Sequence, residues 1–292
     1  MKVGDCGQLS ERDVADHDDD LLDPRGDGRF RFGENWQSFL DTITDEAIAE
    51  AERGMNRLFP NGEIRGASLL DIGSGSGLSA LAACRLGARV VDAIDIDPQS
   101  VAATEAVLSK FVHGSKWSVQ RQDLFEVPSE QPQAYDIVYS WGVLHHTEAM
   151  WNAVDRAAAM VRPQGHLAIA LYHRTPLCPL WRLEKRFYAQ AGEKAQTAIR
   201  SLYKALYRSA LLATLRNPNR YIAAYRSARG MDWHHDVHDW LGGYPYDSTN
   251  SAAVVAHLKE LRFVPQQIFE HEAPAFGLFG SHCDEYVFRR LH

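Results

Sequence analysis

The chain is poor in cysteine and has no long apolar run. The four cysteines among its 292 residues form no C-x-x-C pair: Cys6, Cys84, Cys178 and Cys283. This spacing argues against a disulfide framework or a zinc knuckle and favours reduced thiols in a cytoplasmic protein. No run of about 18 apolar residues occurs, so we expect no membrane span. The N-terminus has no basic region followed by an apolar stretch, so we expect no secretory signal.

The chain has a net charge of −7, and its charged residues are unevenly distributed along the sequence. Residues 1–30 carry nine Asp or Glu against four Lys or Arg, and residues 181–229 carry eleven Lys or Arg against two acids. The acidic segment, residues 1–28, predicts a mobile tail. The basic segment could be a solvated helix face, or an electropositive rim that attracts phosphate or carboxylate substrates. A contact surface for RNA or an anionic membrane ranks third, because no RNA-binding module is visible.

Short apolar strands alternate with helices between residues 63 and 175. We expect strands at residues 68–72, 89–96, 117–121, 135–141 and 166–172, and helices at residues 78–86, 98–111 and 149–161. Pro163 and Gly165 are expected to end the last of these helices. The alternation is typical of the α/β class, with a parallel sheet covered by helices on both faces.

The flanking segments have different patterns. Residues 29–62 predict an N-terminal helical lid with a helix over residues 44–58, and residues 176–247 predict a helical insertion that covers the substrate. The end of this insertion, residues 231–247, is rich in His, Asp, Trp and Gly and is expected to be a loop. Residues 248–292 predict a helix and an antiparallel strand pair that complete the core.

A glycine-rich turn, LLDIGSGSG at residues 69–77, follows the first strand of the core. Glycines let the backbone approach a ligand closely, and the N-terminus of the next helix points N–H groups at that ligand. Leu78 stands where a dinucleotide fingerprint needs glycine, and no Lys-Ser/Thr pair follows, so neither that fingerprint nor a P-loop fits. Asp71 precedes the first glycine, where it could meet the ammonium group of an amino acid.

Acidic residues also follow the next two strands. Asp95 lies 22 residues beyond Gly73, close to the interval of roughly 20 expected for an acid that holds ribose hydroxyls, and Asp97 could share that role. Asp123 follows the third strand, where it could accept a hydrogen bond from an adenine amino group with Leu124 beside the ring.

Five segments in order resemble the motifs of class I S-adenosylmethionine-dependent methyltransferases: LLDIGSGSG, AIDIDPQSV, RQDLFEVP, YDIVYSWGVLHHT and MVRPQGHLAIALY. The resemblance covers residues 66–172 and the final strand pair. It implies a seven-stranded, doubly wound Rossmann-like sheet with the last strand antiparallel, and S-adenosyl-L-methionine as cofactor. The cofactor-binding residues it implies are Asp71, Gly73, Ser74, Gly75, Gly77, Asp95, Ile96, Asp123, Leu124, Trp141 and Gly142. Residues 30–36, with Phe32 and Trp36, resemble the N-terminal lid of some members.

Methyl transfer from a sulfonium is an in-line displacement, so most of the task is alignment with water excluded. A base is needed only where the acceptor must lose a proton. The candidate bases lie after the fourth and fifth strands and in the insertion: His145, His146, His173, His234, His235 and Asp236. The aromatic residues expected to contact substrate, besides Phe32 and Trp36, are Tyr172, Trp233, Tyr244 and Tyr246.

The insertion has two other interpretations. His234 and His238 would share one helix face with Asp239 near them, as metal ligands do. However, these ligands bunch within six residues and there is no H-E-x-x-H motif, so we predict no metal ion. The cluster could instead be a structural latch between the insertion and the core.

The sequence therefore predicts an enzyme that methylates O, N or C of a small, anionic or aromatic metabolite. Methylation of tRNA or protein is an alternative within enzymes, although nucleic acid is the less favoured partner. A non-catalytic adenosylmethionine-fold interaction protein is the alternative of another class. The intact set of glycines, Asp95 and Asp123 argues against it. The oligomeric state stays open.

Overall fold

The computed structural model describes residues 43–114, 116–127, 135–229, 233–271 and 274–292. The expected acidic tail and the lid residues Phe32 and Trp36 lie outside the described residues. No helix in the described ranges is both long and apolar enough to cross a membrane.

The described strands form one seven-stranded sheet of order β3-β2-β1-β4-β5-β7-β6. The strands are β1 (Ser68–Ile72), β2 (Val90–Asp95), β3 (Lys116–Arg121), β4 (Tyr135–Trp141), β5 (Val161–Tyr172), β6 (Phe263–Phe269) and β7 (Cys283–Arg290). β7 runs antiparallel to both of its neighbours, while the other neighbouring pairs are parallel. The predicted seven-stranded sheet with a reversed last strand is confirmed.

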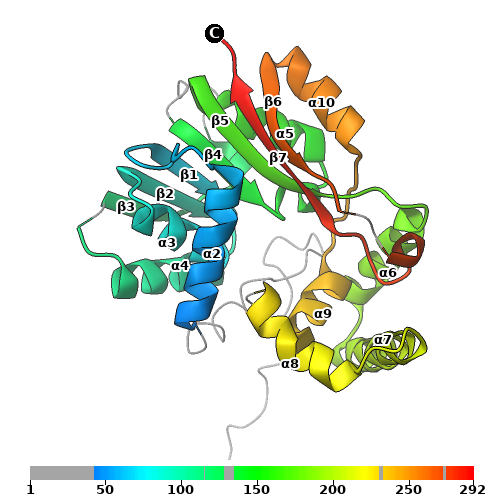
Figure 1. The fold of residues 1–292 in the computed structure, drawn as a ribbon. Helices are drawn as coiled ribbons and strands as arrows, with labels where there is room; N and C mark the ends of the chain where they lie inside the picture. Colours follow the sequence, from blue (N-terminus) through cyan, green and yellow to red (C-terminus); the bar gives the residue numbers. More distant parts are fainter. Residues whose placement is uncertain (1–42, 115, 128–134, 230–232, 272–273) are drawn as a thin grey trace, which may run out of the picture.

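Helices cover both faces of the sheet (Figure 1). One layer consists of α2 (Asp45–Leu58), α3 (Leu78–Arg85) and α4 (Pro98–Phe111), and the other of α5 (Met150–Ala159) and α10 (Ser251–Glu260). Every residue of β1 is buried, and its side chains alternate between the layers: Leu69 packs in the α2–α4 layer, and Leu70 in the α5–α10 layer. This burial on both faces explains the nearly continuous apolar runs of the strands.

The start of β5 differs from the prediction. The preceding helix ends at Ala159 and β5 begins at Val161, so Pro163 and Gly165 lie inside a strand. The β4–β5 register shifts between Tyr135 and Ile137, and this irregularity accommodates the additional residues. A Cβ at Gly165 would lie 2.8 Å from the Asp136 carbonyl oxygen, so the backbones approach too closely for another residue.

Between β5 and α10 the described residues form four helices, which we call the cap: α6 (Cys178–Gln190), α7 (Glu193–Ala213), α8 (Pro218–Arg229) and α9 (Trp233–Gly242). The expectation of a loop at residues 231–247 was wrong, because α9 occupies most of it. Trp233, Val237 and Leu241 recur at helical spacing and are buried in the cap interior. α8 contacts α2, so the cap reaches across to the N-terminal helix of the core.

Candidate functional site

The glycine loop joins β1 to α3 at the carboxyl edge of the sheet. Gly73 and Gly77 have φ values of 74° and 77°, which favour glycine. A Cβ at Gly73 would lie 2.4 Å from Val143 Cγ2, and one at Gly77 2.8 Å from Thr104 Cα. The loop is therefore tightly packed between α4 and the residue after β4. No side chain caps the N-terminus of α3.

Asp95 fixes the loop to the end of β2. Its Oδ2 accepts a hydrogen bond from Gly75 N at 3.0 Å, and its Oδ1 accepts one from Asp97 N at 2.9 Å. Burial raises the pKa of Asp95 to about 6. Asp97 instead caps α4 by accepting from Gln99 N at 2.8 Å. Of the two candidates for the ribose, it is Asp95 that contacts the loop.

Asp71 is buried behind the same loop, with 2% of its surface exposed. Burial, followed by the nearby charge of Asp95, raises its pKa to about 7. Among the described residues its Oδ2 has no hydrogen-bond partner. A buried acceptor without a donor is costly, and a cationic ammonium group would satisfy it. This site therefore fits an amino-acid moiety.

The next residues expected around the cofactor lie after β2, β3 and β4. Asp123 Oδ1 accepts from Phe125 N at 2.9 Å and caps a short 3-10 turn, η2 (Leu124–Glu126), in which Leu124 is buried. Ile96 is half-buried after β2. Gly142 has a φ of 74°, and its Cα faces open space.

The side chain of Ser74 is bonded to α4. Its hydroxyl lies 2.9 Å from Thr104 Oγ1 in α4. Ser74 thus holds the loop against that helix.

The sequence analysis missed two residues near Trp141: Glu285, which bonds to its indole, and Arg57, which bonds to Glu285. Trp141, at the end of β4, is 45% exposed, and its Nε1 donates to Glu285 Oε1 at 3.0 Å. Arg57 in α2 donates to Glu285 Oε2 at 2.6 Å. The available signal was a pair of acids, Asp284 and Glu285, directly before the apolar residues Tyr286, Val287 and Phe288 of β7.

His145 and His146 lie in the turn η3 (Leu144–His146) after β4 and pack beneath the cap. The ring centroid of His145 lies 3.9 Å from that of Tyr172, and His146 Nδ1 lies 2.6 Å from the Pro245 carbonyl oxygen. Burial lowers the pKa of His145 well below its usual range and that of His146 to about 4. Both rings are therefore neutral near pH 7.

Tyr172 and Tyr246 belong to the same packing cluster. Their ring centroids are 5.3 Å apart. Tyr246 is buried, with its hydroxyl 3.2 Å from Cys178 Sγ and 3.0 Å from Ser281 Oγ. Tyr244, two residues earlier, is half-buried.

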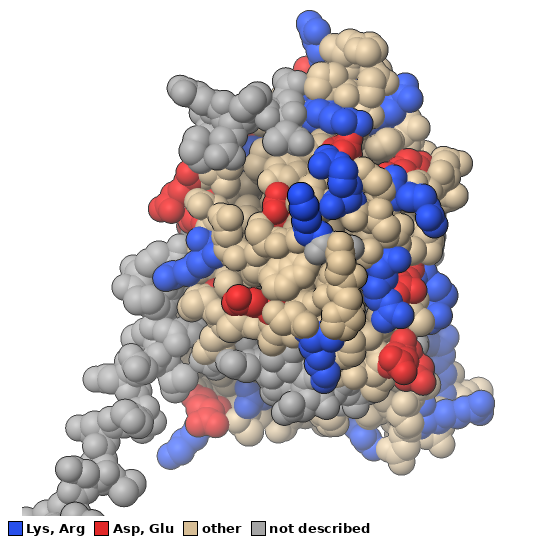
Figure 2. Space-filling view, turned by 90° about the vertical axis from the view of Figure 1, so that its left-hand side faces the viewer, with Lys and Arg blue, Asp and Glu red and all other residues tan. Residues whose placement is uncertain are grey.

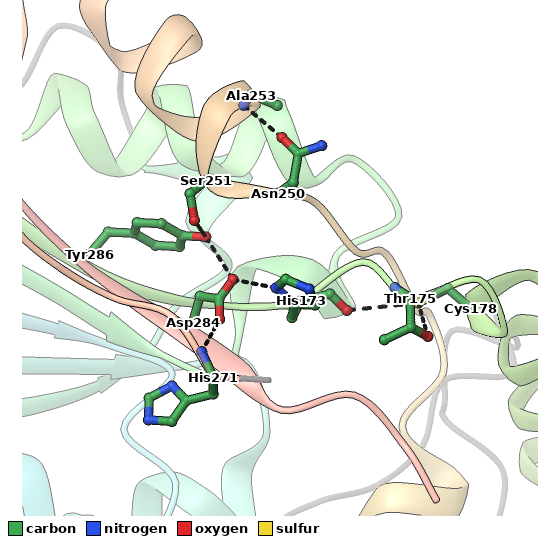
Figure 3. Close-up of polar contacts among 9 residues, drawn as sticks. All are labelled: His173, Thr175, Cys178, Asn250, Ser251, Ala253, His271, Asp284 and Tyr286. Carbon is green, nitrogen blue, oxygen red and sulfur yellow. Dashed lines mark hydrogen bonds and ion pairs between the residues drawn. The ribbon is translucent and has the colours of Figure 1, made fainter. Parts of the chain in front are cut away.

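His173 directly follows β5, and its ring is held by the buried carboxylate of Asp284 in β7 (Figure 3). Its Nδ1 lies 2.7 Å from Asp284 Oδ2, and Asp284 is fully buried. Asp284 also accepts from Tyr286 OH at 3.2 Å and from His271 N at 2.8 Å. The His173 side chain is 31% exposed, and no described residue forms a hydrogen bond with its Nε2. A buried acid that fixes one ring nitrogen leaves the other available as a proton acceptor.

The candidates in the insertion are held within the cap. Trp233 is 3% exposed in the cap interior, and Asp236 accepts a hydrogen bond from Tyr225 OH. His234 is exposed, with its ring 5.0 Å from that of Trp233. The side chain of His235 lies outside the described residues. Across the described ranges, no group of three His, Cys, Asp or Glu is arranged to hold a metal ion.

Comparison with known proteins identifies the family. Residues 43–241 match the model of a methyltransferase domain. This chain belongs to the class I S-adenosylmethionine-dependent methyltransferases. The family uses S-adenosylmethionine, and the tight glycine loop and the unsatisfied Asp71 of this methyltransferase fit that cofactor.

Two curated relatives match part of this methyltransferase. Ribosomal protein L11 methyltransferase of Xanthomonas oryzae pv. oryzae is 32% identical over 128 residues, which cover 44% of this chain and 38% of the relative. Ubiquinone biosynthesis O-methyltransferase of Xanthomonas euvesicatoria pv. vesicatoria is 32% identical over 114 residues, covering 39% and 46%. The matches therefore span less than half of either relative.

Solved structures share the fold. Magnesium protoporphyrin IX methyltransferase from Synechocystis PCC 6803, with bound SAH, superimposes with a TM-score of 0.50 at 15% identity, covering 85% of this chain and 84% of that one. The 1,6-didemethyltoxoflavin-N1-methyltransferase from Burkholderia thailandensis gives 0.50 at 16% identity, covering 89% and 86%. At this identity the likeness shows the fold alone.

Proposed function

We propose that this methyltransferase transfers the methyl group of S-adenosylmethionine to O, N or C of a small, anionic or aromatic metabolite. The observation that carries the proposal is the cap, a helical unit with its own aromatic core that is packed over the ends of β4 and β5. A unit packed over the strand ends can enclose a small acceptor and exclude water from it.

The proposed cofactor site uses the loop and the strand ends. Asp71 meets the ammonium group, and the backbone of Gly73, Gly75 and Gly77 lies against the methionine moiety. Asp95 has both carboxylate oxygens fixed by backbone N–H groups and retains lone pairs for ribose hydroxyls. Asp123 and Leu124 contact the adenine, and Ile96, Trp141 and Gly142 line the site. The cofactor supplies a methyl group that its sulfonium has already activated.

His173 is the base of this proposal. Asp284 holds the ring through Nδ1, which leaves the Nε2 lone pair to accept a proton from the acceptor. The charged imidazolium is then stabilised by the buried carboxylate. His145 and His146 serve the site by packing, together with Tyr172, because burial lowers their pKa values and disfavours the imidazolium that a base must form.

Methylation of a protein or tRNA is the second candidate. It is supported by the partial similarity to a ribosomal protein methyltransferase and by the basic residues of the cap. Such an acceptor would bind through phosphates or acidic groups, and its binding would fall steeply with salt.

The test begins with calorimetric titration of S-adenosylmethionine and S-adenosylhomocysteine into the purified protein. Labelled methyl transfer is then measured with a panel of phenols, carboxylic acids, total tRNA and ribosomal proteins. Transfer to a small molecule supports the proposal, and transfer to RNA or protein alone supports the second candidate. Cofactor binding without transfer to any class would favour the non-catalytic alternative.

A further inference from the structure

The outer side of the cap exposes large apolar side chains. In α6, Leu180, Leu183 and Phe187 are 62%, 66% and 62% exposed. In α7, Leu202 and Leu206 are 62% and 55% exposed. Exposed residues of this size are ordinary when single, but a contiguous group on one surface marks an interaction site.

The α6 residues form a stripe. Leu180, Leu183 and Phe187 have the i, i+3, i+7 spacing that places side chains on one helix face. Lys185 and Tyr188, which are buried, project from the other side of the same helix. The stripe therefore lies opposite the face that α6 uses for the cap interior.

α7 is divided in the same way. Leu202 and Leu206 are one turn apart, whereas Tyr203, Tyr207 and Leu211 pack inward or are buried. Ala198 and Ala205 are exposed and fall on the outward face by the same spacing. The outward side of α7 therefore lacks charge where the leucines lie.

A segment before β7 extends this surface. Trp181 Nε1 donates to the Gly277 carbonyl oxygen at 2.7 Å, and Tyr203 OH donates to that of Phe279 at 2.8 Å. These bonds hold residues 277–279 against α6 and α7, and the neighbouring Phe276 and Leu278 are 81% and 54% exposed. Figure 1 shows α6, α7 and the dark red turn η4 (Pro274–Gly277) together on one side of the molecule. We call this surface the outer cap face: Leu180, Leu183, Phe187, Leu202, Leu206, Phe276 and Leu278.

Basic side chains are exposed on α6 and α7, which carry the outer cap face, and on the neighbouring α8; of these, Arg182 is bonded to the Tyr246 carbonyl oxygen and to Asp247. Among the described side chains of residues 178–225, six exposed ones are basic: Arg182, Arg186, Lys194, Arg208, Arg216 and Arg220. Glu193 is the one exposed acid in that range. The face of the molecule in Figure 2 differs, because Lys or Arg and Asp or Glu are interspersed on it. The combination of exposed leucine and phenylalanine with a single sign of charge belongs to the cap.

We propose that the outer cap face docks on the surface of an anionic lipid membrane. Leucine and phenylalanine side chains enter the boundary between headgroups and acyl chains, and exposed basic side chains of α6 and α7, such as Arg186 and Lys194, contact lipid phosphates. Self-association through this face would bring two basic surfaces together. RNA fits this face less well, because five of its seven side chains are leucines, which offer no ring on which a base can stack.

The test is co-sedimentation of the full-length protein with vesicles of phosphatidylcholine alone or mixed with phosphatidylglycerol. We expect binding to the mixed vesicles, weakened by salt because exposed charges are screened. The paired change Leu183→Glu and Phe187→Glu should lower the partition coefficient at least about tenfold, because two apolar side chains are lost from the interface. Leu291→Glu is the matched control, since Leu291 is 40% exposed beyond β7. Far-UV circular dichroism melts verify that each variant is folded.

Three results would overturn the proposal. The first is no binding of the wild type to mixed vesicles, and the second is equal loss of binding in the control variant. The third is a wild-type dimer, seen by light scattering, that the paired change converts to a monomer. That result would assign the outer cap face to a second copy of the chain.

Discussion

In the core, the carboxylates at the ends of β2 and β3 are fixed by backbone groups, whereas in the cap Asp236 and His238 are fixed by other side chains. Asp95 and Asp123 accept from N–H groups of residues near a strand end. In the cap, Asp236 is bonded to Tyr225, and His238 Nδ1 lies 2.7 Å from Tyr188 OH. Backbone donors remain when side chains change, so the core geometry is carried by the fold. The cap geometry depends on residues from several helices. Substitutions in the two regions should therefore have different effects.

The largest effect is expected for His173→Asn, which removes the proposed base at the core edge. We expect kcat to fall about 100-fold or more, with cofactor affinity unchanged, because general bases contribute roughly 10²- to 10⁴-fold. Steady-state kinetics with the identified acceptor measure it.

The matched control is His257→Asn. His257 Nε2 lies 2.6 Å from Asp155 Oδ1, a similar pair, but that Asp155 side chain is 48% exposed. The control should retain kcat within about twofold, because exposed ion pairs contribute little. Equal loss in the two variants would mean that His173 acts through folding alone.

The second-largest effect is expected for Asp95→Ala. Loss of the proposed acceptor for ribose hydroxyls, together with loss of the bond from Gly75 N, should weaken binding of S-adenosylhomocysteine about 100-fold, since hydrogen bonds to charged groups contribute about 1.5–3 kcal/mol each. Calorimetry gives the dissociation constant. Asp97→Ser, which retains a helix cap, should bind within a few-fold of wild type. If the two variants weaken binding equally, Asp95 has no special role.

Asp71→Asn separates stability from binding in the core. The folded pKa of Asp71, about 7, lies above its unfolded value of about 3.9, so the folded state binds the proton more tightly. In the cofactor-free protein, the contribution of Asp71 to the free energy of unfolding should therefore be greatest below about pH 4 and should be lost as pH rises through about 7. Urea unfolding at about pH 8 should show the asparagine variant more stable by about 2 kcal/mol, yet weaker in cofactor binding. A variant that is less stable at that pH contradicts the assignment.

The smallest effect is expected in the cap, for the paired change Glu184→Gln and Lys185→Met. Lys185 is fully buried, with Nζ 3.5 Å from the Trp240 ring centroid. Burial lowers its pKa and raises that of Glu184, so the charged forms are unfavourable. Replacement should change the unfolding free energy by about 1 kcal/mol, in the stabilising direction, and leave cofactor affinity unchanged. Weaker cofactor binding would show that the cap pair supports the core site.

The core was largely predictable from the sequence because its signals are local. β1, β2 and β4 are short runs rich in apolar residues, and Asp71, Asp95 and Asp123 lie within two residues of a strand end. The glycine loop needs only consecutive residues to define its turn. The start of β5 was missed because Pro163 and Gly165 usually end structure, and only pairing with β4 shows that they lie in an irregular strand.

The remaining site residues were not predictable, since pairing over long distances in the chain brings them together. His173 was a candidate, but its partner Asp284 is 111 residues away and reaches it through β7. Glu285 reaches Trp141 and Arg57 in the same way. In the cap, α9 was taken for a loop because His and Asp outnumber its apolar residues. Only the packing of Trp233 and Val237 against other helices reveals its buried face.

The pairing of β5 with β7 positions both Asp284, which contacts His173, and Glu285, which contacts Trp141. Leu171 is opposite Asp284 and Ala170 is opposite Glu285 in this antiparallel register. Neighbouring strand residues face opposite sides of a sheet, so a slip of one residue would exchange the two acids. His173 would lose its carboxylate in the same event that deprives Trp141 of its acceptor. With His173 as the proposed base, enzyme turnover becomes a readout of strand alignment, and a misregistered molecule with normal secondary structure is expected to be inert.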